Sequence, residues 1–177
     1  MAKKLRYVRH SKKEGAIIGR EGLNYAAEKA PAGEYTDVFH GPLYRTAQTA
    51  LAVVCALGSK AMVHVPVAEI GSDELFATMV NDEFKAAVKS GKTNIEALFV
   101  SDHGDELVAS WTTDAALGVE MMLNQIPDDG FGIAFGHDPI IPLAARGYGS
   151  DVPSLKEMEY IDFILDNGVI TIVDPRQ

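Results

Sequence analysis

Short apolar runs alternate along the chain with longer segments in which apolar residues recur every three or four positions. The short runs are rich in β-branched or aromatic residues and predict four strands, at residues 5–11, 36–40, 63–67 and 131–135. The longer segments have helical periodicity and predict three helices, at residues 17–30, 42–57 and 107–126. This alternation favours a parallel sheet whose strands are joined by helices.

The C-terminal part of the chain has the pattern of a hairpin. Two apolar runs, residues 158–165 and 169–173, flank Asp166-Asn167-Gly168, and Asn-Gly supplies the positive φ angles of a tight turn. Strands joined by so short a turn are antiparallel. We therefore predict the α/β class, with a single three-layer α/β/α sandwich over residues 1–177 and a mostly parallel central sheet that has an antiparallel edge.

Length and composition fit one domain and argue against two classes of partner. The chain has 177 residues, of which 47% are hydrophobic, enough to bury a sizeable core. Its formal net charge of -9 argues against binding to nucleic acid or to a membrane surface, because both demand basic patches. A few positive groups in a pocket can still bind an anion, since screening acts over ~8 Å at physiological salt.

The N-terminus and the cysteine content bear on the cellular compartment. Arg6 and Arg9 interrupt the apolar run that follows the basic start, so we expect no signal peptide and a cytoplasmic protein. Cys55 is the only cysteine, which excludes an intrachain disulfide and a cysteine-rich zinc site. It lies in an apolar stretch of the second predicted helix, where we expect it to pack in the core.

The first predicted strand ends on Arg9 and His10, a pair suited to phosphate. The carboxyl ends of strands in open α/β sheets border the crevice in which ligands bind. Arginine offers a fixed fork of donors to phosphate oxygens, and a neutral imidazole, with a usual pKa of ~6.5, can attack phosphorus at physiological pH. Lys12, Lys13 and Arg20 follow, and we interpret them as solvated surface.

The second predicted strand leads into a helix whose start carries another arginine. Residues 41–50 read Gly-Pro-Leu-Tyr-Arg-Thr-Ala-Gln-Thr-Ala, in which the proline suits the first helical position. The amino terminus of this helix points to the same sheet edge as the first strand and offers N–H groups to an anion. Arg45 lies in the first turn, and Gln48 and Thr49 share its face and can line or brace the site.

A second histidine follows the fourth predicted strand. Residues 136–139 read Gly-His-Asp-Pro, in which Asp138 and Pro139 suit the cap and the first position of another helix. A histidine at the end of a predicted strand, as at His10, thus occurs a second time, here followed by the start of a helix. We therefore expect His10 and His137 to face one phosphate.

Together these segments resemble the histidine phosphatases of the phosphoglycerate mutase-like superfamily. The resemblance rests on Val8-Arg9-His10, on residues 42–50 and on Gly136-His137-Asp138-Pro139, which occur in the order of that family. Residues 72–129 carry no motif that we can align. The short chain and its Gly-His-x-Pro ending are most similar to the phosphohistidine phosphatase branch.

The resemblance implies a role for each matching residue. His10 would be the nucleophile that becomes a phosphohistidine, while Arg9, Arg45 and His137 would hold the phosphoryl oxygens. Glu69 follows the third predicted strand and would be the proton donor, with a surface carboxylate as the alternative interpretation. The implied activity is metal-independent hydrolysis of a phosphomonoester or a phosphohistidine, with no cofactor and no metal.

The chain departs from the family at several positions. Ser11 stands where many members have glycine after the Arg-His pair, and Gly41 stands where many have serine. Members that act on sugar phosphates often have an asparagine soon after the first motif and Gly-Gly after the second histidine, and this chain has neither. We expect the partner to be a small phosphorylated molecule or a phosphohistidine-bearing protein, and the oligomeric state stays undetermined.

Three alternatives remain open. The same residues could form a non-catalytic module that binds a phosphorylated ligand, or could transfer a phosphoryl group as a phosphoglycerate mutase does. Residues 101–106, Ser-Asp-His-Gly-Asp-Glu, could instead join His137 and Asp138 in a divalent metal site of a hydrolase, since imidazole and carboxylate suit such ions. The same run also has the features of a loop before the helix at 107–126, where early acids favour the dipole.

Overall fold

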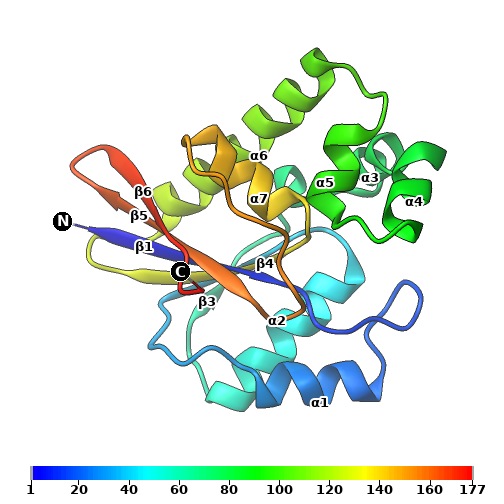
Figure 1. Ribbon diagram of the computed structural model, residues 1–177. Coiled ribbons are helices and arrows are strands. Elements are labelled where there is room, and N and C mark those ends of the chain that lie inside the picture. Colours follow the sequence, from blue (N-terminus) through cyan, green and yellow to red (C-terminus); the bar gives the residue numbers. More distant parts are fainter. Residues whose placement is uncertain (1, 177) are drawn as a thin grey trace.

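One six-stranded sheet organises the chain in the computed structural model, which describes residues 2–176 (Figure 1). Its strands are β1 (Lys3–Arg9), β2 (Asp37–His40), β3 (Met62–Val63), β4 (Phe131–Gly136), β5 (Tyr160–Asp166) and β6 (Val169–Val173). Their spatial order is β3-β2-β4-β1-β5-β6. The first four run parallel, whereas β5 and β6 pair antiparallel, which confirms the predicted mixed sheet.

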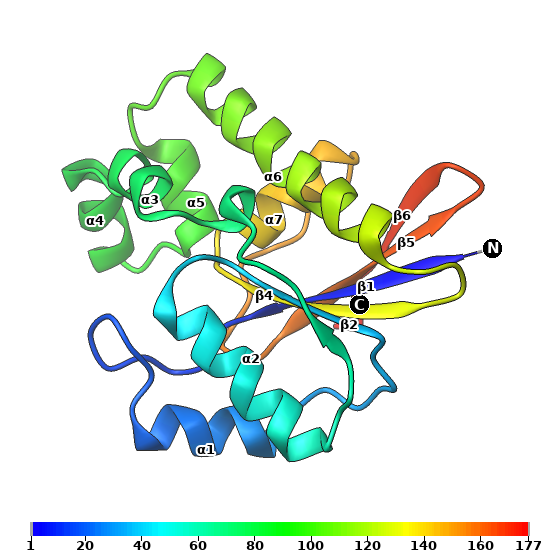
Figure 2. The same cartoon turned by 180° about the vertical axis from the view of Figure 1, so that it is seen from behind.

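Helices cover both faces of this sheet (Figures 1 and 2). α1 (Arg20–Glu28) and α2 (Tyr44–Leu57) lie on one face, and α6 (Asp105–Gln125) and α7 (Ile140–Gly147) lie on the other. Three short helices gather near the start of α6, namely α3 (Asp73–Met79), α4 (Asp82–Lys89) and α5 (Asn94–Val100). No helix within residues 2–176 has the length and apolar character needed to cross a bilayer.

The central parallel strands bury side chains on both faces, so buried apolar residues stand at successive positions, as at Tyr7 and Val8 of β1. In β1, Leu5 and Tyr7 belong to the core under α6 and α7, whereas Val8 belongs to the core under α1 and α2. In β4, Ala134 belongs to the core under α6 and α7, and Phe135 belongs to the core under α1 and α2. Successive side chains of a strand point to opposite faces, so each central strand contributes to both cores.

Two helix starts differ from the prediction. α2 begins at Tyr44 with Leu43 as its N-cap, so Pro42 precedes the helix instead of occupying its first position. The carbonyl of Leu43 already accepts the Thr46 amide and hydroxyl, which places the start of the hydrogen-bonded turn after the proline. α7 begins at Ile140 with Pro139 as its N-cap, so Asp138 is not the helix cap.

Two smaller expectations also need correction. β3 comprises only Met62 and Val63, and beyond it the amides of His64 and Val67 still donate to carbonyls of β2. Cys55 is exposed and does not pack in the core. The buried positions of α2 are Thr46, Thr49, Ala50 and Val53, and helical periodicity turns residue 55 away from that stripe.

The predicted C-terminal hairpin is confirmed. β5 and β6 pair antiparallel with Asp166 opposite Val169. Asn167 has φ 50° and Gly168 has φ 79° at the turn between them. Both residues adopt the left-handed backbone that the Asn-Gly signal predicts.

Candidate active site

Two of the predicted residues meet because β1 and β4 are neighbours in the sheet. Arg9 stands opposite Gly136 in the parallel register, so the next residues, His10 and His137, emerge side by side at the carboxyl ends of the strands. The His10 amide donates to the Gly136 carbonyl at 2.9 Å. The two imidazole centroids are 4.8 Å apart at an interplanar angle of 64°. The strand register therefore holds both rings at one point.

The tautomer of His10 follows from its hydrogen bond. Its Nδ1 lies 2.6 Å from the carbonyl oxygen of Ser11, and a carbonyl can only accept. Nδ1 therefore carries the proton, and Nε2 of the neutral ring keeps a free lone pair. This is the protonation state that a nucleophilic imidazole needs.

Ser11 is hydrogen-bonded to α1 and α2, the two helices that cover one face of the sheet. Its amide donates to the Thr49 hydroxyl at 3.1 Å, and its own hydroxyl donates to the Gly22 carbonyl at 2.7 Å. The Thr49 hydroxyl in turn donates to the Arg45 carbonyl, and the Gln48 side chain accepts from a backbone amide before α1. Thr49 thus braces the segment that follows His10, whereas Gln48 braces the segment before α1. The Ser11 hydroxyl makes a hydrogen bond that a glycine at this position could not make.

Arg45 in the first turn of α2 lies beside an aromatic side chain that the sequence did not single out. Its guanidinium carbon is 5.7 Å from the centroid of the Phe76 ring, and this ring packs edge-on against His137 with centroids 4.8 Å apart. Phe76 belongs to α3, within the segment without a recognisable motif. Together with Leu75 and Met79 it forms an apolar pattern that predicts only a packed helix. No sequence signal therefore distinguishes Phe76 as a residue of the site.

Gly71 is a second residue that sequence reasoning missed. It has φ 126°, and a Cβ built on it would lie 2.6 Å from Cδ2 of His137. Only glycine both adopts this backbone conformation easily and leaves room for the ring. A glycine shortly after a predicted strand is the one sequence signal that could have found it.

Burial and positive charge keep both imidazoles neutral. Burial lowers the pKa of His10 to about 3, and the charges of Arg45, Arg9 and Lys13 act in the same direction. The pKa of His137 is also held well below its usual value, first by burial and then by the ring of His10 and the same three cations. Lys13, which we expected to be ordinary surface, therefore belongs to the electrostatic surroundings of the site.

Solved structures of known proteins share this architecture. Phosphoglycerate mutase from Bacillus anthracis superposes with a TM-score of 0.71 at 12% identity, over 98% of this chain and 92% of that one. Phosphoserine phosphatase from Entamoeba histolytica, bound to 3-phosphoglyceric acid, gives 0.64 at 18% identity over 97% and 95%. The protein histidine phosphatase SixA, bound to tungstate, gives 0.55 at 14% identity over 96% and 94%. The chain has the histidine phosphatase fold. No protein-family model and no curated protein matches its sequence.

On this histidine phosphatase fold, Glu69 lies in the segment that follows β3. It is half-buried in the short 3₁₀ helix η1 (Ala68–Ile70), two residues before Gly71. Its Cβ packs toward α6, because a Cβ on Gly118 would lie only 3.0 Å from it. Within residues 2–176 its carboxylate makes no hydrogen bond or ion pair with Arg9, His10, Arg45 or His137. A role as proton donor therefore stays a prediction.

The residues of the alternative metal site do not come together. The His103 ring packs against Trp111 with centroids 4.9 Å apart, and the Ser101 hydroxyl donates to the Ala97 carbonyl. Over the part of the chain that the structure describes, no group of three or more histidine, cysteine, aspartate or glutamate side chains is arranged to hold a metal ion. Asp105 and Glu106 instead occupy the first turn of α6, where acids favour the helix dipole.

The neutral histidines predict a dependence of stability on pH. Below about pH 6.5 the unfolded chain protonates these rings, whereas the folded protein resists protonation of His10 until about pH 3. The free energy of unfolding should therefore be unaffected by them above pH ~6.5 and fall below it, by up to ~1.4 kcal/mol per pH unit for each histidine. Urea denaturation at several pH values should give a shallower slope for His10→Gln than for the wild type. Identical slopes would contradict the burial of a neutral His10.

Proposed function

We propose that the protein is a phosphatase that transfers a phosphoryl group to His10 and then to water. The observation that carries the proposal is the buried, neutral His10, whose Nδ1 is bonded to the Ser11 carbonyl and whose ring packs against His137. The structural neighbours, which include phosphatases and a phosphoglycerate mutase, support chemistry on phosphate.

The proposed reaction has two displacements. Nε2 of His10 donates its lone pair to phosphorus, and the bond from phosphorus to the leaving group breaks with its electron pair on the leaving atom, which takes a proton. Water then attacks the phosphohistidine, releases phosphate and returns the electron pair to Nε2. Both displacements spread negative charge over the three remaining phosphoryl oxygens.

Arg9, Arg45 and His137 are proposed to hold that charge. The Nε atoms of both arginines and Nε2 of His137 are buried and make no hydrogen bond with residues 2–176, so none of these three atoms is engaged elsewhere in the fold. Each charge-assisted hydrogen bond contributes ~1.5 to 3 kcal/mol net, and preorganised donors give the largest electrostatic contributions in many enzymes. These residues and His10 therefore account for the proposed transfer without a metal or a cofactor.

The substrate class follows from the same site. A phosphomonoester and a phosphohistidine side chain present the same tetrahedral group to these donors, so we propose a small phosphorylated molecule or a phosphohistidine protein as the partner. Hydrolysis is favoured over a mutase reaction, because a mutase must shield its phosphoenzyme from water and members that do so usually have longer insertions.

A substrate panel tests the proposal. The wild-type protein should release phosphate from at least one phosphomonoester or phosphohistidine substrate in the presence of EDTA, and acid-labile phosphoenzyme should accumulate. Activity that disappears with EDTA and returns with a divalent ion would replace the histidine mechanism. Vanadate binding without hydrolysis or phosphoenzyme would identify a binding module, and transfer to a second position of the substrate would identify a mutase.

Glu69 is proposed as the acid that protonates the leaving group. General acid catalysis contributes ~100- to 10,000-fold and matters most for a poor leaving group. Glu69→Gln should therefore lower kcat on an alkyl phosphate by ~100-fold or more and should affect p-nitrophenyl phosphate much less. Glu74→Gln, on the exposed first turn of α3, is the control and should change neither rate. An equal loss on both substrates would argue against the assignment.

A further inference from the structure

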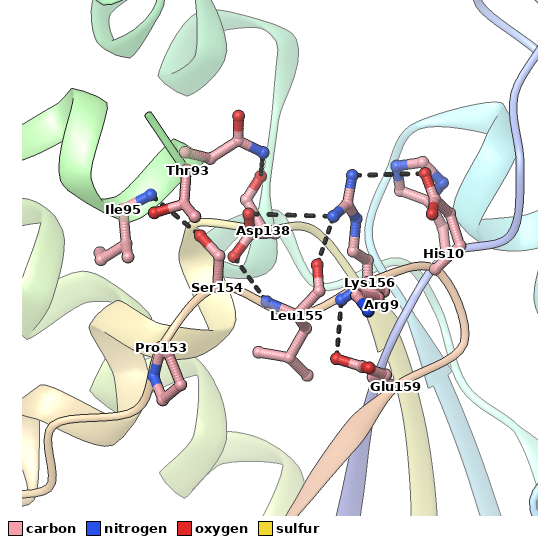
Figure 3. Close-up of polar contacts among 12 residues, drawn as sticks. Arg9, His10, Thr93, Ile95, Asp138, Pro153, Ser154, Leu155, Lys156 and Glu159 are labelled. Carbon is pink, nitrogen blue, oxygen red and sulfur yellow. Dashed lines mark hydrogen bonds and ion pairs between the residues drawn. The ribbon is translucent and has the colours of Figure 1, made fainter. Parts of the chain in front are cut away.

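Asp138 lies beside Arg9 instead of capping α7 (Figure 3). Its side chain is 1% exposed, and Oδ1 accepts the Leu155 amide at 3.3 Å. Oδ2 lies 3.9 Å from a terminal nitrogen of Arg9 and has no hydrogen-bond partner among residues 2–176. The buried carboxylate therefore has the Arg9 guanidinium as its nearby positive charge.

Several segments meet around this pair. The same Arg9 nitrogen donates to the Leu155 carbonyl, so Leu155 bonds to both members of the pair through its backbone. At the start of α5, the Asn94 side chain donates to the Asp138 carbonyl at 3.4 Å, and the Ile95 amide donates to the Ser154 hydroxyl at 3.1 Å. Figure 3 shows these contacts on one side of the Arg9 side chain.

The other side of Arg9 is less constrained. Its second terminal nitrogen lies 3.6 Å from a carboxylate oxygen of Glu157, whose side chain is 39% exposed. An exposed ion pair contributes little, because water screens it and both side chains remain mobile. The buried pair with Asp138 therefore determines the direction of the guanidinium more strongly.

Burial of a carboxylate is unfavourable unless charge and hydrogen bonds compensate it. Burial raises the pKa of Asp138, whereas the charge of Arg9 and the hydrogen bond from the Leu155 amide lower it. Nothing in the hydrolytic steps above uses this carboxylate directly. Its contacts point instead to an effect on Arg9.

We propose that Asp138 is a positioning residue that fixes the Arg9 guanidinium in the orientation that receives a tetrahedral oxyanion. The inference rests on the proposed function, because it assigns Arg9 to the phosphoryl oxygens. Placing a donor correctly before the ligand arrives lowers the cost of binding and of reaching the transition state.

Asp138→Asn tests this role with little change in volume. The amide oxygen can still accept from Leu155, but the amide nitrogen would then turn its N–H groups toward the donors of Arg9. Titration calorimetry with orthovanadate should show affinity about tenfold lower, the scale of one charge-assisted hydrogen bond. On a hydrolysed substrate, kcat/KM should fall on the order of 100-fold, as for a misplacement of ~1 Å.

Asp162→Asn on β5 is a matched control, because its partner Arg6 lies on β1, the strand that ends at Arg9. Asp162 is buried and binds Arg6 of β1 through two hydrogen bonds of 2.8 and 3.0 Å, three residues before Arg9. Loss of this pair should lower the melting temperature without weakening vanadate binding. A purely structural role of Asp138 would give the same result as the control.

A double variant shows whether Asp138 acts through Arg9. Arg9→Ala should weaken vanadate binding, and Arg9→Ala with Asp138→Asn should bind vanadate no more weakly than Arg9→Ala alone. Additive losses, unchanged affinity in Asp138→Asn, or tighter binding in that variant would each overturn the inference.

Vanadate binding and substrate hydrolysis are measured separately, so the test of Asp138 does not depend on the test of the phosphatase proposal. A wild-type protein that binds vanadate but hydrolyses nothing would refute the phosphatase proposal, while the vanadate comparisons would still decide the role of Asp138. If Asp138→Asn fails to fold, the arginine side-chain NMR signals of the wild type decide. The Arg9 signal, assigned from Arg9→Lys, should show restricted guanidinium rotation without ligand, and free rotation would exclude positioning.

Discussion

Replacing His10 by alanine is expected to lower kcat/KM by at least about 10,000-fold, because it removes the atom that forms the bond to phosphorus. The remaining donors can still bind the substrate, so KM should change far less than kcat. The phosphoenzyme that acid lability and phosphorus NMR detect in the wild type should be absent. A variant that hydrolyses substrate at a rate close to that of the wild type would exclude His10 as the nucleophile.

His40→Ala is the appropriate control for that experiment. His40 ends β2, the neighbour of β4, and its Nδ1 lies 2.7 Å from the carbonyl oxygen of the next residue, as His10 does at 2.6 Å. The two histidines thus share their local backbone interaction but not their surroundings. Activity close to that of the wild type in His40→Ala would show that loss of this local bond does not itself abolish turnover.

The second large effect is expected for Arg45→Ala. Loss of one preorganised donor to a developing oxyanion costs ~100- to 1000-fold in kcat, and Arg45 is proposed to supply such a donor. The melting temperature of this variant should not decrease although its kcat does. Burial lowers the pKa of both Arg45 and Lys13, and the charges of Arg45 and Arg9 lower the pKa of Lys13 further, so these cations repel one another. The melting temperature of Arg45→Ala should be equal to or above that of the wild type.

Arg20→Ala separates this effect from a general change in charge. Arg20 is exposed at the first residue of α1, and its loss changes the net charge by the same amount. It should leave kcat and vanadate affinity unchanged. A marked drop in the melting temperature of Arg45→Ala, with activity retained, would identify Arg45 as a structural arginine.

The sequence sufficed to predict the sheet and the meeting of His10 with His137 because the relevant signals are local. Strand ends such as Val8-Arg9-His10 are readable from a few residues, and parallel neighbours bring their carboxyl ends to one edge. The approach of His137 to His10 follows from that rule once both strands are recognised. The Asn-Gly turn is local in the same sense.

The surroundings of these residues could not be predicted, because they depend on contacts distant in sequence. Phe76 reaches His137 across 61 positions of the chain, and its helix has no motif. Asp-Pro often begins a helix and so predicts Asp138 as a helix cap, but the carboxylate faces Arg9 and Leu155. Lys13 resembles any surface lysine until the fold brings its charge near the imidazoles.

The position of β1 in the sheet has a consequence for biosynthesis. β1 lies between β4 and β5, so both of its partners come from the last third of the chain. During translation the first strand leaves the ribosome early and stays unpaired on both edges until β4 has been made. Its buried apolar residues Leu5, Tyr7 and Val8 are then available to chaperones or to other nascent chains, and recovery of the native sheet on refolding reports the pairing of β1 with β4 and β5.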